Sequence, residues 1–84
     1  MEKILVLNSG STTVKFQLFQ MNRESCLVIA QGVAERIGLE GSKVTIKAEK
    51  KDDYILENHL SDHKDAIKAI LDYLLRLLPN LLTL

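Results

Sequence analysis

The spacing of apolar residues changes once along this chain, close to residue 60, and the change restricts the folds open to 84 residues. Before that point, apolar and polar residues alternate or form short apolar runs, which are patterns typical of β-strands. The five expected strands cover residues 3–7, 14–19, 26–34, 43–48 and 54–56. Beyond that point, apolar residues recur at helical spacing as far as Pro79. We therefore predict a five-stranded mixed β-sheet followed by one helix, an α/β chain that is α+β-like in this segment.

The residues around the change of period also predict where the elements begin and end. Ser61 stands where the N-cap of the helix is expected, and Asp62 and Asp65 fall in the first turn, where the helix dipole favours acidic side chains. Glycines mark turns or close approaches of the backbone: Gly32 inside the third strand, and Gly38 and Gly41 after it. No linker separates the elements, so residues 1–84 are expected to form at most one small domain without an internal boundary.

The expected sheet carries more apolar surface than one helix can cover. Residues 3–7, with the sequence KILVL, form a nearly continuous apolar run that is typical of a strand buried on both faces. The helix is apolar beyond a single stripe, because Leu71 and Leu75 widen its apolar face. Apolar surface left in water costs roughly 25 cal/mol per Å². We therefore expect the chain to be part of a larger protein or of an oligomer, with its leucine-rich end favouring association.

The composition argues against several classes of partner. The chain has 11 Lys and Arg against 11 Asp and Glu, whereas nucleic-acid-binding modules usually carry a basic surplus. Cys26 is the single cysteine, so neither a disulfide framework nor a cysteine metal site is expected, and a reducing cytoplasmic setting is favoured. No apolar run reaches the roughly 18 residues of a transmembrane helix, so no membrane partner is expected.

The loop between the first two expected strands has residue types that suit a phosphate group. A phosphate requires converging hydrogen-bond donors, little steric bulk and positive charge. Gly10 allows close approach of the backbone, Lys15 supplies charge, and Asn8 offers an amide to an anion or to a Mg²⁺-bound water. Hydroxyl groups come from Ser9, Ser11, Thr12 and Thr13. These residue types fit two interpretations, a phosphate-binding loop and a polar connection with an exposed lysine.

Two widespread phosphate-binding motifs are absent from this loop. The P-loop pattern requires a glycine directly before its lysine and a helix after it, but Val14 precedes Lys15 and a strand is expected to follow. The dinucleotide pattern G-x-G-x-x-G is also missing. Binding without a helix dipole would depend on loop amides, hydroxyl groups and Lys15.

Other chemically active residues have simpler interpretations. His59 and His63 lie four residues apart, but the H-E-x-x-H pattern is absent and we expect solvated histidines at the helix start rather than a zinc site. Cys26 is expected to be a small core or edge residue. Arg36, near the end of a strand, is expected at the surface or in an interdomain contact.

Three segments of the sequence together resemble one known family. ILVLNSGSTTVKFQLF closely resembles the N-terminal signature of the acetate kinase (acetokinase) family: an apolar strand, Asn-x-Gly-Ser and two hydroxyl residues, an apolar residue, Lys and a second strand. GVAERIG followed by EGS resembles the third strand and its turn, and DHKDAIKAILDYL resembles the first helix. The resemblance implies the start of a ribonuclease H-like domain of the actin, Hsp70 and sugar-kinase type, with residues 1–84 as a partial N-terminal domain.

The resemblance also implies a reaction and roles for the loop residues. Acetokinases transfer a phosphoryl group between ATP and a short carboxylate such as acetate, giving acetyl phosphate and ADP, with Mg²⁺ and as homodimers. By this likeness Asn8 would lie near Mg²⁺ and the transferred group, and Ser11 and Thr13 would line the catalytic site. The ATP phosphates would be bound by Gly10, Ser11, Thr12, Thr13 and Lys15.

The other catalytic groups of the family are not found within these 84 residues, so the chain alone is expected to be inactive. Acetate, propionate and butyrate are not distinguished as substrates. The alternatives are a non-catalytic phosphate-binding or protein-interaction module rich in β-structure, and an inactive structural fragment.

Overall fold

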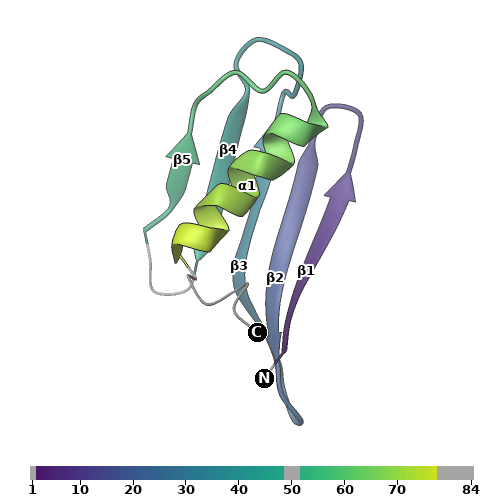
Figure 1. Cartoon of the computed structure of the whole chain (residues 1–84), viewed down its shortest axis with the longest axis vertical. Helices are drawn as coiled ribbons and strands as arrows, with labels where there is room; N and C mark the ends of the chain where they lie inside the picture. Colours follow the sequence, from purple (N-terminus) through teal and green to yellow (C-terminus); the bar gives the residue numbers. More distant parts are fainter. Residues whose placement is uncertain (1, 49–51, 78–84) are drawn as a thin grey trace.

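The computed structural model describes residues 2–48 and 52–77, which form a five-stranded sheet and one helix. The elements are β1 (Glu2–Ser9), β2 (Val14–Met21), β3 (Cys26–Glu35), β4 (Lys43–Ala48), β5 (Tyr54–Leu56) and α1 (His63–Leu77). The predicted strands and helix are therefore confirmed. Figure 1 shows α1 lying diagonally across one face of the sheet, so the described chain has two layers.

The expectation of a mixed sheet is wrong for the pairings described, because every strand is antiparallel to its neighbour. The strands lie in sequence order, β1-β2-β3-β4-β5. Short turns explain this result, since adjacent strands joined by a few residues reverse direction, whereas a parallel pair needs a crossover of about a dozen residues or more. Each of the first four strands pairs directly with the strand that follows it in the chain.

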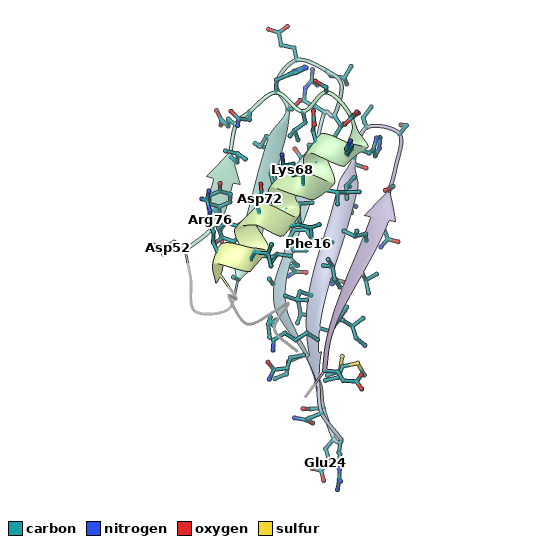
Figure 2. The ribbon with its side chains drawn as sticks, in the orientation of Figure 1. Phe16, Glu24, Asp52, Lys68, Asp72 and Arg76 are labelled. Carbon is teal, nitrogen blue, oxygen red and sulfur yellow. The ribbon has the colours of Figure 1, made fainter. Side chains whose placement is uncertain are left out.

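The core lies between α1 and the middle of the sheet. The alternating residues Val14, Phe16 and Leu18 of β2 all face this layer and are buried. From the helix, Ala66, Ile70 and Leu74 meet them at the four-residue spacing of a buried stripe. The polar face of α1 points outward, and Figure 2 shows Lys68, Asp72 and Arg76 along it.

Gly32 on β3 allows the ring of Phe16 to lie against the sheet. Gly32 pairs with Phe16 on one side and Ile46 on the other. A Cβ at this position would lie 2.7 Å from Phe16 Cε1 and would also collide with the Thr45 carbonyl oxygen. The predicted close approach at Gly32 is thus confirmed, while the register shift of this strand pair lies instead between Leu18 and Phe19 of β2.

Strand β1 was expected to be buried on both faces, and this expectation is wrong within the described structure. The strand lies at the edge of the sheet, where Ile4 is 40% exposed, Val6 38% and Leu7 39%. The helix covers the middle of the sheet instead, and no described residue covers the face opposite α1. Further exposed apolar side chains include Val28 and Ile55.

The cap of α1 differs from the prediction by one residue. The helix begins at His63, and Asp62 Oδ1 accepts a hydrogen bond of 2.9 Å from the Asp65 N–H, so Asp62 rather than Ser61 is the N-cap. The Asp65 side chain accepts in turn from the Ser61 N–H at 3.1 Å. Two carboxylates therefore satisfy two backbone donors at the helix start, a role that one Ser hydroxyl could fill only in part. Pro79 and the leucine-rich end beyond it lie outside the described residues.

Candidate phosphate-binding loop

Three segments far apart in the sequence meet at one end of the sheet. They are the loop between β1 and β2 (residues 10–13), the turn between β3 and β4 (residues 36–42), and the start of α1 (Figure 1). The Ile37 N–H donates to the Thr12 carbonyl at 3.0 Å, and His63 Nε2 lies 2.6 Å from the Gly10 carbonyl oxygen. These two contacts hold the loop against the β3–β4 turn and against the start of α1. The opposite end of the sheet is the β2–β3 hairpin, where Glu24 marks the tip in Figure 2.

The turn that supports the loop is itself closely constrained. Arg36, Gly38 and Gly41 all have positive φ, with angles of 55°, 79° and 84°. The buried hydroxyl of Ser42 lies 2.9 Å from the Arg36 carbonyl oxygen and 3.0 Å from that of Leu39. The Gly38 N–H donates to the Leu60 carbonyl at 2.7 Å, which ties the turn to the segment before α1. The predicted turn glycines are confirmed, and their left-handed conformation brings Ile37 against the loop.

Within residues 10–13, every carbonyl except that of Ser11 accepts a hydrogen bond, whereas every N–H except that of Gly10 donates to no described residue. The carbonyls of Gly10, Thr12 and Thr13 accept from His63, Ile37 and the Gly10 N–H respectively. By contrast, the N–H groups of Ser11, Thr12 and Thr13 donate to no other residue that the structure describes. Because the open donors outnumber the one open carbonyl, that of Ser11, the loop favours an anion over a cation.

The direction of these N–H groups follows from peptide geometry. In a trans peptide the C=O and the next N–H point in opposite directions within one plane, and the described residues contain no cis peptide. The Gly10 carbonyl points toward His63, so the Ser11 N–H points away from it. The Thr12 carbonyl points toward Ile37, so the Thr13 N–H points away from the β3–β4 turn. Both donors therefore face away from the segments that support the loop.

Gly10 makes room for the side chain of Thr13. A Cβ on Gly10 would lie 2.7 Å from Thr13 Oγ1, closer than real Cβ atoms approach other heavy atoms. The Gly10 N–H also donates to the Thr13 carbonyl at 2.8 Å. A larger residue at position 10 would displace the Thr13 hydroxyl, so the tight loop geometry explains the glycine there.

Asn8 and Lys15 are brought together beside the loop. They are direct partners in the β1–β2 register, and both are exposed on the face opposite α1. Directly opposed side chains of this kind have Cβ atoms about 5 Å apart. Both line a shallow cavity of about 440 Å³, which Lys47 of β4 also lines. Ser11, Thr12 and Thr13 lie in the adjoining loop and not in the cavity wall.

His63 is the contact to the loop that sequence reasoning missed. The expectation of two solvated histidines is right for His59, which is exposed, and wrong for His63, which is half-buried against the loop. One signal in the sequence could have found it. His63 precedes Ala66 and Ile70 by three and seven residues, so it extends the buried stripe of α1 to the helix start. Cys26, in contrast, is exposed and free at the first position of β3.

Neither a metal cluster nor a membrane helix occurs in the part of the chain that the structure describes. There, no group of three or more His, Cys, Asp and Glu side chains is arranged to hold a metal ion. Over the same residues, no helix has the length and hydrophobicity needed to cross a membrane.

Comparisons with known proteins agree with the fold. A model of the Acetokinase family matches residues 3–82. The acetate kinase of Clostridium beijerinckii is 51% identical over 69 residues, which cover 82% of this chain and 17% of that protein. The acetate kinase of Thermotoga petrophila is 44% identical over 72 residues, covering 86% of this chain and 17% of that protein.

Solved structures of an acetate kinase and a propionate kinase also match this chain. The crystal structure of Porphyromonas gingivalis acetate kinase matches with a TM-score of 0.78 and 36% identity, covering 89% of this chain and 18% of that one. A propionate kinase from Francisella tularensis matches with a TM-score of 0.77 and 34% identity, covering 90% of this chain and 19% of that one.

The sheet, the helix and these matches define a kinase-type segment with the α/β fold of the actin and Hsp70 class. The chain belongs to the Acetokinase family. It spans about 17% of the length of the curated relatives it matches.

Proposed function

We propose that the β1–β2 loop binds the phosphate groups of Mg²⁺-ATP and that this binding serves phosphoryl transfer between ATP and acetate, with acetyl phosphate and ADP as products. The observation that carries the proposal is the loop backbone, in which the carbonyls of Gly10, Thr12 and Thr13 are bonded and three N–H groups are left open. Membership of a family whose relatives are named acetate kinases supports the reaction.

Each loop residue has a role in this proposal. Lys15 supplies positive charge beside the loop, and its exposure leaves the ammonium free to reach a phosphate oxygen. Ser11 and Thr13 contribute hydroxyl groups next to the open amides and line the catalytic site. Thr12 adds a third open N–H for the ATP phosphates, and Gly10, whose own N–H and carbonyl are bonded, lets the backbone approach the phosphates closely. Positioning and charge stabilisation of this kind provide most of the catalysis in phosphoryl transfer.

The residues present fit a Mg²⁺ ion that arrives with the nucleotide. Mg²⁺ keeps several waters and takes only one or two protein oxygens together with phosphate oxygens. Asn8 offers such an oxygen from an exposed amide beside the loop. Bound there, the ion would neutralise charge on the phosphate oxygens.

Calorimetry with ATP and Mg²⁺ tests the proposal on the 84-residue chain. We expect Lys15→Ala to weaken binding about tenfold, because a charge-assisted contact to phosphate is lost. Lys47→Ala is the matched control, since it removes a second exposed lysine from the same cavity but from a strand that does not adjoin the loop. Equal losses in the two variants, or no loss in either, would contradict a specific role for the loop.

A second substrate has an observation in its favour. A propionate kinase is among the structures that match, with a TM-score close to that of the acetate kinase. Comparing kcat/KM of the full-length enzyme for acetate, propionate and butyrate would decide between these acids.

The proposal also includes a homodimer located in the cytoplasm, and this part of it rests on the family resemblance. The competing interpretation, a non-catalytic phosphate-binding or protein-interaction module, gains some support from the exposed apolar residues of the face opposite α1.

A further inference from the structure

We propose that His63 is a positioning residue of the β1–β2 loop: its Nε2–H donates to the Gly10 carbonyl and so holds the Ser11 N–H toward the bound phosphate. The contact joins residues 53 positions apart in the sequence, at 2.6 Å. It lies outside the set of loop residues expected to touch the nucleotide. Its consequence for nucleotide binding depends on the function proposed above, but the contact itself can be measured without any ligand.

The chemistry of the two atoms fixes which ring nitrogen carries the proton. A carbonyl oxygen has no hydrogen to donate, so His63 must supply it from Nε2. In a neutral ring this assigns the Nε2–H tautomer, with Nδ1 as the nitrogen that carries the lone pair. His63 is half-buried at the first position of α1, where the Asp62 cap fixes the helix start. The imidazole is therefore carried by an ordered element rather than by a loop.

The contact matters because the Gly10–Ser11 peptide moves as one planar unit. When the Gly10 carbonyl is held by His63, the Ser11 N–H faces the opposite way, where it is open to an anion. If the peptide rotated about its neighbouring bonds, it would instead present the carbonyl oxygen, which repels phosphate. Glycine at position 10 makes such a rotation easy, since it has no Cβ to restrict the backbone.

The two anchors of the loop differ in kind. The Thr12 carbonyl is held by the Ile37 N–H, a backbone donor that side-chain substitution at position 37 leaves in place. The Gly10 carbonyl is held by a side chain, so a substitution at position 63 can remove this anchor by itself. Two carbonyl contacts orient the loop amides, and the contact made by His63 is the one that a side-chain substitution can remove.

The first measurement needs no ligand. Nitrogen-15 NMR of the imidazole in the wild-type chain is expected to show the Nε2–H tautomer for His63. The Ser11 amide is expected to change its chemical shift and its hydrogen-exchange rate in His63→Leu, and to keep wild-type values in His63→Gln, whose terminal amide replaces the Nε2–H donor. His59→Leu is the matched control, because His59 is exposed four residues earlier. An Nδ1–H tautomer, or a Ser11 amide that is the same in His63→Leu and wild type, would overturn the inference.

The second measurement tests the consequence with ATP and Mg²⁺ as the probe. His63→Leu is expected to bind about two- to tenfold more weakly, the usual range for one lost hydrogen bond. His63→Gln and His59→Leu are expected to bind as the wild type does. Equal binding by His63→Leu and wild type would overturn the positioning role while leaving the proposed function standing. If the wild type itself does not bind, the proposed function fails and the NMR data decide the His63 contact alone.

Loss of the fold is separable from loss of the anchor. The Ile37 amide, which donates to Thr12 and not to His63, reports whether the rest of the site is intact in each variant. Should His63→Leu fail to fold, the tautomer of the wild type and the Ser11 amide of His63→Gln still decide the question, since a Gln variant with a displaced Ser11 amide contradicts the inference.

Discussion

At the scale of single residues, Gly10 in the β1–β2 loop and Gly32 in β3 act by leaving space. Gly10 leaves room for the Thr13 hydroxyl, and Gly32 leaves room for the Phe16 ring and the Thr45 carbonyl. Neither depends on a positive φ, in contrast to Gly38 and Gly41 in the β3–β4 turn. The same residue type therefore meets two physical demands in one small sheet, close packing and an unusual backbone angle.

Packing at Gly32 leads to a prediction about stability. Gly32→Val is expected to lower the free energy of unfolding by about 1–3 kcal/mol, because the added methyl groups overpack the contact with Phe16 and the β4 backbone. Urea denaturation measures the change. Gln31→Ala, at the neighbouring exposed position, is the control and should shift the value by no more than about 0.5 kcal/mol. A Gly32→Val chain as stable as wild type would contradict the close packing described for this position.

At the scale of elements, the sequence predicts what local spacing controls. Alternation of Val14, Phe16 and Leu18 predicts both the strand and its buried face, and the four-residue recurrence of Ala66 and Ile70 does the same for the helix. Strand direction was predicted less well, because a pattern of apolar residues carries no information on pairing. The short turns between the strands do contain information on pairing, because strands joined by a few residues must run antiparallel, as they do here.

The helix start and the site show the limits of local patterns. Ser61 and Asp62 are both good caps, and the choice between them depends on which side chain reaches the Asp65 N–H. The loop residues Asn8 to Lys15 were proposed from residue types because they are close together in the sequence. His63 was not, since its meeting with Gly10 depends on how α1 crosses the sheet. Long-range contacts of this kind follow from the fold and not from residue spacing.

At the scale of the whole molecule, the sheet has one covered face and one open face. The helix covers the first, while Val6, Val28 and Ile55 remain exposed elsewhere on the sheet. The sequence predicted an excess of apolar surface correctly but placed too much burial on β1. A strand sequence specifies that a face is apolar, and only the covering layer determines whether that face is buried. Relatives several times longer than this chain have further residues that could provide such a layer.

The activity of the chain alone is predicted at this same scale. In a mixture of ATP, acetate and Mg²⁺, we expect the 84-residue chain to release ADP no faster than buffer does. Phosphoryl transfer needs several charged groups around the transferred phosphoryl group, and the loop provides only one part of that set. A coupled ADP-release assay measures this, with a full-length acetate kinase as the positive control. Clear turnover by the 84-residue chain would show that the groups assumed to be missing are not needed.

The central claim is that open amides of the β1–β2 loop bind phosphate, and a titration followed by two-dimensional ¹H–¹⁵N NMR tests it most directly. As ATP and Mg²⁺ are added, the amide signals of Ser11, Thr12 and Thr13 are expected to shift together and to saturate with one dissociation constant. Amides at the far end of the sheet, such as that of Glu24, should not move. Saturable shifts that leave the three loop amides unchanged, or no shifts at all, would contradict the account.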